Sequence, residues 1–144
     1  MNYTNIEQSK KLLELGLSPE SADMYWQSNM DTTDREYLMN ELNEEESFVI
    51  EPNIEHCSIG KYDIPCWSVG ALLELMPSVI EKNGKEYVLE LLKDIDDEPF
   101  YILRYYDLKN IEYDIVQREE ENLTVALYQM TGWLLENKYI NKGE

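Results

Sequence analysis

Positive charge is scarce in this chain. Its 144 residues contain 12 Lys and Arg against 30 Asp and Glu, which gives a net charge of −18. Ordinary binding to DNA or RNA and docking on anionic membranes both depend on basic side chains, so this charge disfavours them. We therefore expect neither direct nucleic-acid binding nor membrane attachment, and we expect the acidity chiefly to keep a small protein in solution.

Residues that carry common catalytic and metal chemistry are also few. Cys57 and Cys66 are the only cysteines and are too far apart for a zinc knuckle, and His56 is the only histidine. The sequence has no glycine-rich phosphate loop, nucleophile elbow or metalloprotease helix. Adjacent carboxylates such as Asp96 and Asp97 are expected by chance in so acidic a chain. The sequence therefore predicts no metal, no cofactor and no catalytic residue.

Long hydrophobic runs are missing as well. No apolar stretch approaches the length of a membrane span. The start of the chain lacks the basic patch and apolar run of a secretory signal. We expect a cytoplasmic protein.

The composition is otherwise that of a folded domain, with 43% hydrophobic and 11% aromatic residues. The length suits a single domain over residues 1–144 with one core. Within it, residues 27–60 form an acidic segment: positions 41–55 hold six glutamates, Glu44, Glu45 and Glu46 among them, and no Lys or Arg. A solvated loop is the simple interpretation of such a run, and a docking surface is the alternative.

Start signals predict two helices near the N-terminus. Thr4 and Glu7 have the spacing of a capping box, which predicts a helix over residues 5–15. Pro19 suits the first position of a helix, where its missing N–H has no partner to lose, and this predicts a second helix over residues 19–26. The two helices would form a hairpin.

Two further helices are predicted later in the chain. Ser68 precedes apolar residues at helical spacing, and Pro77 ends the pattern, so a short buried helix is expected between them. Residues 123–137 carry one apolar stripe at the same spacing, and either Asn122 or Thr124 can cap it. This is the long C-terminal helix of the predicted fold.

Between these helices the apolar period changes from 3.6 to 2, which is typical of strands. Asn83 and Gly84 form a hairpin-turn signal before residues 87–91, and residues 100–106 and 111–116 alternate in the same way. The sequence therefore predicts an α+β fold, in which an antiparallel sheet of three to four strands packs against helices. We expect its exposed face to carry Glu90, Arg104, Glu112 and Asp114.

Several stretches also resemble a known family. They are residues 6–17 with 22–25, residues 65–77, and residues 130–140. Together they resemble a family of small uncharacterised proteins that are encoded in genomes and in prophage-like or other mobile elements of gut Bacteroides-type bacteria. The resemblance implies a shared fold and an association with mobile elements, and it implies no enzyme activity or ligand.

Tyrosine is the remaining candidate signal, with 11 in the chain. Tyr101, Tyr105 and Tyr113 lie in predicted strands, where tyrosine serves either cross-strand packing or contact with a partner. The leading hypothesis is a non-enzymatic accessory or protein-interaction domain of mobile-element origin. It would bind an unidentified protein partner through this tyrosine-bearing sheet face or through the acidic segment.

Two other classes of function stay open. The chain would be an acidic nucleic-acid mimic, or an immunity-type inhibitor, if Glu44, Glu45 and Glu46 and residues 94–98 occupy the basic cleft of a protein partner. A small-molecule enzyme or binder would instead require a deep pocket with converging polar groups.

Overall fold

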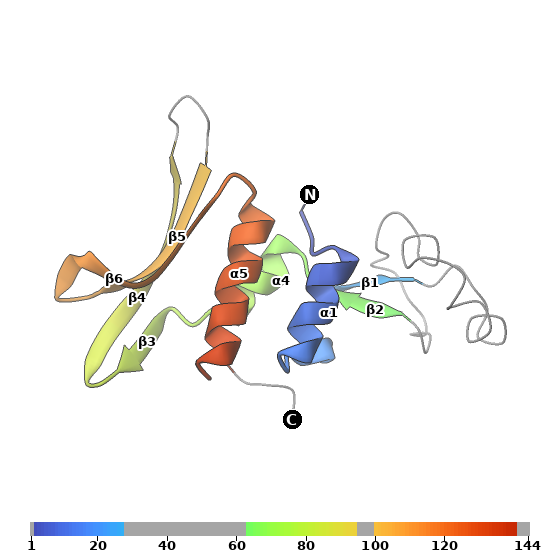
Figure 1. Cartoon of the computed structure of the whole chain (residues 1–144), viewed down its shortest axis with the longest axis horizontal. Helices are drawn as coiled ribbons and strands as arrows, with labels where there is room; N and C mark the ends of the chain where they lie inside the picture. The colour runs from blue at the N-terminus through green and yellow to red at the C-terminus, as the bar shows by residue number, and fades with distance from the viewer. Residues whose placement is uncertain (1, 28–62, 95–99, 141–144) are drawn as a thin grey trace.

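The computed structural model describes residues 2–27, 63–94 and 100–140 of the chain (Figure 1). The described residues form three α-helices, one short 3-10 turn and six strands. In chain order these are α1 (Ile6–Glu14), the 3-10 turn η1 (Pro19–Ser21), β1 (Met24–Trp26), β2 (Ile64–Cys66), α4 (Val69–Leu75), β3 (Val79–Lys82), β4 (Lys85–Asp94), β5 (Phe100–Asp107), β6 (Asn110–Glu120) and α5 (Leu123–Glu136).

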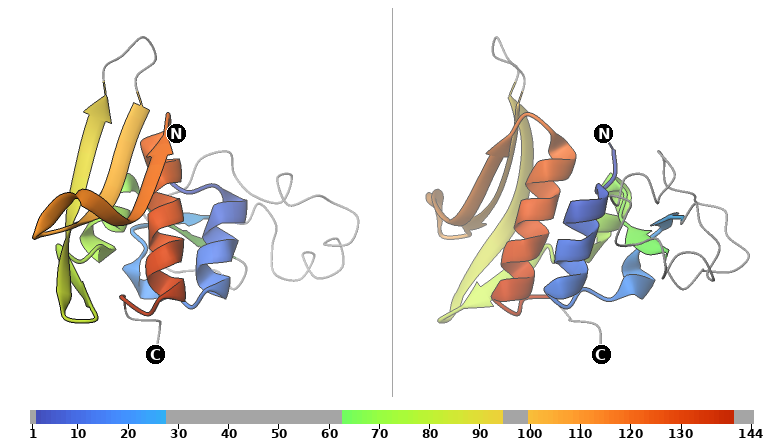
Figure 2. Two further views of the ribbon diagram at one scale, coloured as in Figure 1. Left: turned by 60° about the vertical axis from the view of Figure 1, so that its left-hand side comes forward. Right: turned by 45° about the vertical axis from the view of Figure 1, so that its right-hand side comes forward.

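The strands form two antiparallel sheets. β1 pairs with β2, and β3, β4, β5 and β6 form a four-stranded meander in that order. Figures 1 and 2 show the helices on one side of the meander. The α+β class and an antiparallel sheet beside helices are thus confirmed, and the meander has four strands.

The first helix is capped by different residues from those predicted. The Asn5 side chain accepts a hydrogen bond from the backbone N–H of Gln8 at 2.7 Å, and the Gln8 side chain accepts one from the Asn5 N–H at 3.0 Å. This capping box replaces the predicted pair of Thr4 and Glu7. The reason is that Thr4 is completely buried and uses its hydroxyl for tertiary contacts.

The prediction of a second helix over residues 19–26, which would complete an N-terminal hairpin, is wrong. Only Pro19–Ser21 is helical, as a single 3-10 turn, and the chain then becomes extended in β1. β1 pairs antiparallel with β2, with Tyr25 opposite Pro65, and all three of its residues are buried. Pairing with a distant segment therefore outweighs the local preference for helix.

Thr4 lies at a junction between the N-terminal segment, α1 and the end of β2. Its hydroxyl lies 2.8 Å from that of Ser9 and accepts a hydrogen bond from the Trp67 N–H at 3.1 Å. Its carbonyl accepts hydrogen bonds from the Trp26 indole at 3.1 Å and the Cys66 thiol at 3.2 Å. Each of these groups is buried, so the junction satisfies donors that water cannot reach.

The other predicted elements are confirmed. The Ser68 side chain caps α4, Asn83 and Gly84 form the β3–β4 turn with φ of 54° and 79°, and the Asn122 side chain caps α5. The face of the meander that is turned toward the helices is the inner face. Its buried residues are Ile80, Tyr87, Leu103, Tyr105 and Val116, and α5 contributes Leu127, Met130 and Leu134 to the same core.

We predict that Thr4→Val lowers the free energy of unfolding by about 1–3 kcal/mol, because it leaves the buried Trp67 N–H without an acceptor. Thr131→Val is the matched control. Thr131 is equally buried, but its hydroxyl donates to the Leu127 carbonyl, which already accepts the helical N–H, so no group is left unpaired. Urea unfolding monitored by tryptophan fluorescence measures both variants, and equal losses would contradict the role given to Thr4.

Burial is the main cause that raises the pKa of the Cys66 thiol to about 12. In the unfolded chain a thiol ionises near ~8.5, so above that pH the unfolded state loses a proton that the folded state keeps. We predict that the free energy of unfolding falls between pH 8.5 and 9.5, by up to about 1.4 kcal/mol per pH unit from this residue. Cys66→Ala should reduce the slope of the free energy of unfolding against pH, measured by urea unfolding at several pH values. An unchanged slope would contradict the role given to the Cys66 thiol.

Candidate functional site

The outer face of the four-stranded sheet is the side turned away from the helices. Side chains alternate between the two faces along each strand, and residues paired between strands share a face, so the register assigns every residue. The outer face consists of Val79, Glu81, Glu86, Val88, Glu90, Leu92, Asp94, Phe100, Ile102, Arg104, Tyr106, Asp114, Gln117 and Glu119. Among the described residues, no helix lies against it (Figure 2).

Arg104 occupies the middle of this face. Its Nε donates to Glu90 Oε1 on β4 at 2.7 Å, and one terminal nitrogen donates to Asp114 Oδ1 on β6 at 2.7 Å and to the Ile111 carbonyl at 2.9 Å. Its guanidinium carbon lies 4.8 Å from the centre of the Tyr106 ring. The hydrogen bond to Glu90, followed by that to Asp114, raises the pKa of Arg104 above its usual value despite the opposing effect of desolvation.

Apolar side chains lie on both sides of Arg104. On one side, Val79, Val88 and Tyr106 are neighbours across three strands. On the other side, Leu92 and Ile102 are paired. Val79 is 48% exposed and Leu92 is 47% exposed, and each has an apolar neighbour on the same face. The outer face thus combines an arginine clamp with two uncovered apolar patches.

The same face holds a repulsive pair of carboxylates. Glu81 on β3 lies directly opposite Glu86 on β4, and both residues are exposed. No basic side chain forms a salt bridge with either of them within the described part of the chain. Like charges in directly opposed positions destabilise a sheet, so this end of the face favours the approach of a cation.

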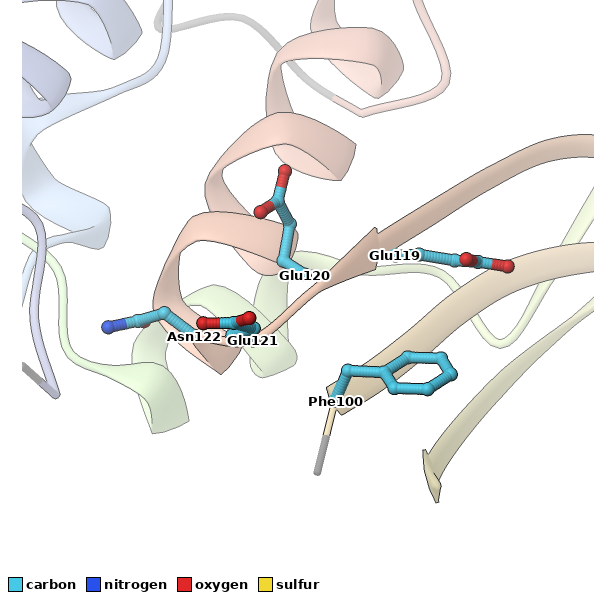
Figure 3. A pocket seen from close by; sticks show the side chains of 5 residues that line it. All are labelled: Phe100, Glu119, Glu120, Glu121 and Asn122. Atoms are coloured by element: carbon cyan, nitrogen blue, oxygen red, sulfur yellow. The ribbon is translucent and has the colours of Figure 1, made fainter. Parts of the chain in front are cut away.

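A shallow pocket of about 640 Å³ lies where β6 meets α5, lined by Phe100, Glu119, Glu120, Glu121 and Asn122 (Figure 3). Figure 3 shows the Glu119 and Glu120 carboxylates pointing in different directions. In the described ranges of the chain, no group of three or more His, Cys, Asp or Glu side chains has the arrangement of a metal site. Of the glutamates in this pocket, Glu119 lies on the outer face, whereas Glu120 lies on the inner face and accepts a hydrogen bond from Gln129 on α5 at 2.9 Å.

The three candidate tyrosines have different surroundings. Tyr105 is completely buried on the inner face, and its hydroxyl donates to the Pro77 carbonyl at 2.7 Å, so its side chain presents no surface to a partner. Tyr113 is 51% exposed, with its ring 6.4 Å from that of Tyr87. Tyr101 is half-buried on the inner face, where the Lys93 amino group lies 5.5 Å from its ring centre.

Among the described tyrosines with a register partner, the one on the outer face is Tyr106, whereas the predicted interaction residues were Tyr101, Tyr105 and Tyr113. Strand alternation contained the signal, because Tyr106 stands two residues after Arg104, which was expected on the exposed face. The prediction that Glu90, Arg104 and Asp114 share that face is confirmed, whereas Glu112 is exposed in a stretch of β6 without a register partner on β5.

Other candidate residues lie outside the described ranges. These are Glu44, Glu45 and Glu46, residues 95–98, and the pair His56 and Cys57. Imitation of nucleic acid by the acidic segments therefore stays a prediction, as does a docking role for residues 41–55.

Comparisons of the chain with family models, with curated proteins and with solved structures return no match. None of the helices described is long and apolar enough to span a bilayer. The surface itself is thus the basis for a functional proposal.

A double-mutant cycle between Glu90→Gln and Arg104→Met should give a coupling energy of about 1 kcal/mol in urea unfolding, because these side chains are only 30% and 20% exposed. The control cycle joins Lys85→Gln and Asp107→Asn. Its atoms are 3.9 Å apart and Lys85 is 62% exposed, so a coupling near zero is expected. Equal coupling energies in the two cycles would show that the pair of Arg104 and Glu90 is no stronger than an ordinary surface ion pair.

Proposed function

We propose that this protein is a non-enzymatic accessory domain of the cytoplasm that binds a protein partner through the outer face of its four-stranded sheet. The observation that carries the proposal is the pair of apolar patches around Arg104, centred on Val79 and Leu92, which no described element covers. An association with prophage-like or other mobile elements belongs to the proposal through the sequence resemblance alone.

The composition of the outer face supports binding to a protein. An antiparallel sheet with one solvated face normally alternates apolar inward with polar outward residues. Here Val88, Leu92, Ile102 and Tyr106 are outward-facing and apolar or aromatic. Contiguous exposed apolar surface bordered by polar residues marks interaction sites, and tyrosine and arginine are enriched in interfaces.

The charge pattern indicates a basic partner. Glu81 and Glu86 border one patch, and Glu119, which is paired with Ile102, borders the other. Arg104, the one cation among the described residues of this face, is bound by two carboxylates. Complementary charge raises the association rate and selects partners, so a partner with basic residues around an apolar centre fits this surface.

The arrangement of titratable groups supports the non-enzymatic part of the proposal. Burial is the main cause of the raised pKa values of Cys66, Tyr105 and Tyr128, and these three residues lie in the packed interior or against it. The described pocket at the corner of the sheet contains none of them. A perturbed group beside converging polar atoms in a cleft is what a catalytic site would require.

Selection of a displayed random-peptide library against the immobilised protein tests the proposal. We expect enrichment of peptides that combine Lys or Arg with aliphatic or aromatic residues, with binding that weakens as salt increases. Val79→Glu should weaken binding of the enriched peptides about tenfold or more, because it places a charge in the apolar patch.

Leu108→Glu is the matched control, since Leu108 is 52% exposed but lies in the turn between β5 and β6. This variant should bind the enriched peptides as the unmodified protein does. No enrichment, or equal binding by both variants and the unmodified protein, would overturn the proposed function.

A further inference from the structure

β4 continues well past the end of β3. β3 pairs with β4 only as far as Val79 opposite Val88, and the last backbone bond on that side runs from the Leu89 N–H to the Ser78 carbonyl at 3.0 Å. Residues 90–94 pair with β5 on one side. On the other side, no strand of the described residues is paired with them, and Figure 1 shows β4 extending beyond β3.

The direction of the backbone groups along this edge follows from the observed bonds. Leu89 donates toward β3, whereas the Glu86 carbonyl accepts from the Leu108 N–H on the β5 side at 3.0 Å. Backbone groups alternate in direction along a strand, so those of Leu91 and Lys93 point away from β5, toward the open side. The edge therefore offers two N–H and two C=O groups in register for another strand.

Of the side chains at this edge, Lys93 places a charge on the inner face, which opposes strand addition, and the other usual protective devices are missing from residues 90–94. Proteins usually protect an open edge with proline, a bulge, a very short strand or inward-pointing charge. Residues 90–94 contain no proline, and the register shifts of the sheet lie between β5 and β6 instead. Leu91 and Leu92 are 38% and 47% exposed on opposite faces, so each face of the edge presents one apolar side chain beside the charged residues Glu90, Lys93 and Asp94.

We infer that the open edge of β4 at residues 90–94 accepts an extended segment of the protein partner as an added strand. This inference rests on the proposed function and names how the partner binds. Main-chain hydrogen bonds to Leu91 and Lys93 would supply affinity, and contacts with side chains of alternating direction would supply specificity.

The neighbouring side chains define the sequence of the added strand. On the outer face, Leu92 lies between Glu90 and Asp94, and on the inner face Leu91 is the apolar neighbour. Cross-strand pairs are favourable between apolar residues and between opposite charges. The segment therefore has two adjacent apolar residues opposite Leu91 and Leu92, and the net charge of −18 on this chain favours basic residues on either side of them.

A second copy of this chain fits the edge less well than a basic segment does. Each copy carries a net charge of −18, so two copies repel on approach. A two-fold pairing of two β4 strands centred on Leu92 would also place Glu90 of each copy opposite Asp94 of the other. Like charges in such opposed positions are unfavourable.

Titration with a defined peptide, followed by NMR of the backbone amides, tests the inference. The probe is a terminally blocked peptide with the order arginine, threonine, valine, valine, arginine. At a free concentration of ten times its Kd, amide exchange of Leu91 and Lys93 should slow roughly tenfold, because only the unbound fraction exchanges. The Leu92 amide, which points toward β5, should change little.

Four controls, two in the peptide and two in the protein, separate strand addition from simple attraction. The same peptide with N-methyl groups on the residues that face β4 should lose this protection, and so should a peptide with glutamates in place of both arginines. In the protein, Lys93→Pro removes the outward N–H at a position where an edge strand tolerates proline. Lys93→Ala keeps that N–H and should bind as the unmodified protein does.

The outcomes distinguish this inference from the proposed function. Shifts confined to outer-face residues such as Val79 and Tyr106, without protection of the Leu91 and Lys93 amides, would overturn strand addition and leave the outer-face site standing. In the absence of peptide, slower exchange of the Leu91 and Lys93 amides at higher protein concentration would also overturn the inference. It would show that a second copy of the chain occupies the edge. If Lys93→Pro does not fold, the N-methyl peptide alone decides the result.

Discussion

Packing of α5 against β5 and β6 determines where the other functional features lie. Leu127, Met130 and Leu134 are completely buried, and together with α4 and α1 they form one core with the inner face of the sheet. Because side chains alternate along a strand, every residue that this packing turns inward leaves its neighbour facing outward. Burial of Leu103 and Tyr105 therefore commits Arg104 and Tyr106 to the opposite face, which no described helix covers.

On the outer face, a charged cluster around Arg104 lies between two apolar patches. Arg104 connects β4, β5 and β6 through Glu90 and Asp114, so the central strands are held together by side chains as well as by the backbone. Its guanidinium also lies over Tyr106, where it is partly shielded from water. The apolar patches on either side are consequently supported by a rigid centre, and a binding surface loses less entropy when its contacts are already ordered.

The extent to which the sequence predicts the structure depends on how far apart the interacting residues are. The β3–β4 hairpin and the helices after Ser68 and Asn122 were predictable because turn and cap signals act between near neighbours. The strand Met24–Trp26 was missed because its partner, Ile64–Cys66, is distant in sequence. The function of Thr4 was missed for the same reason, since it depends on a contact with Trp67 far along the chain, and packing and partner contact both stayed open for Tyr105 because its hydroxyl binds the distant Pro77 carbonyl.

The open edge of β4 gives the acidity of the whole chain a further consequence. An apolar edge that accepts a strand is also a site where molecules can polymerise into fibrils when they become crowded. Mutual repulsion between copies that each carry a net charge of −18 opposes such polymerisation without masking the edge. Substitutions that replace carboxylates are therefore constrained even at positions far from β4. Each one reduces the net negative charge and so weakens the repulsion that opposes fibril growth.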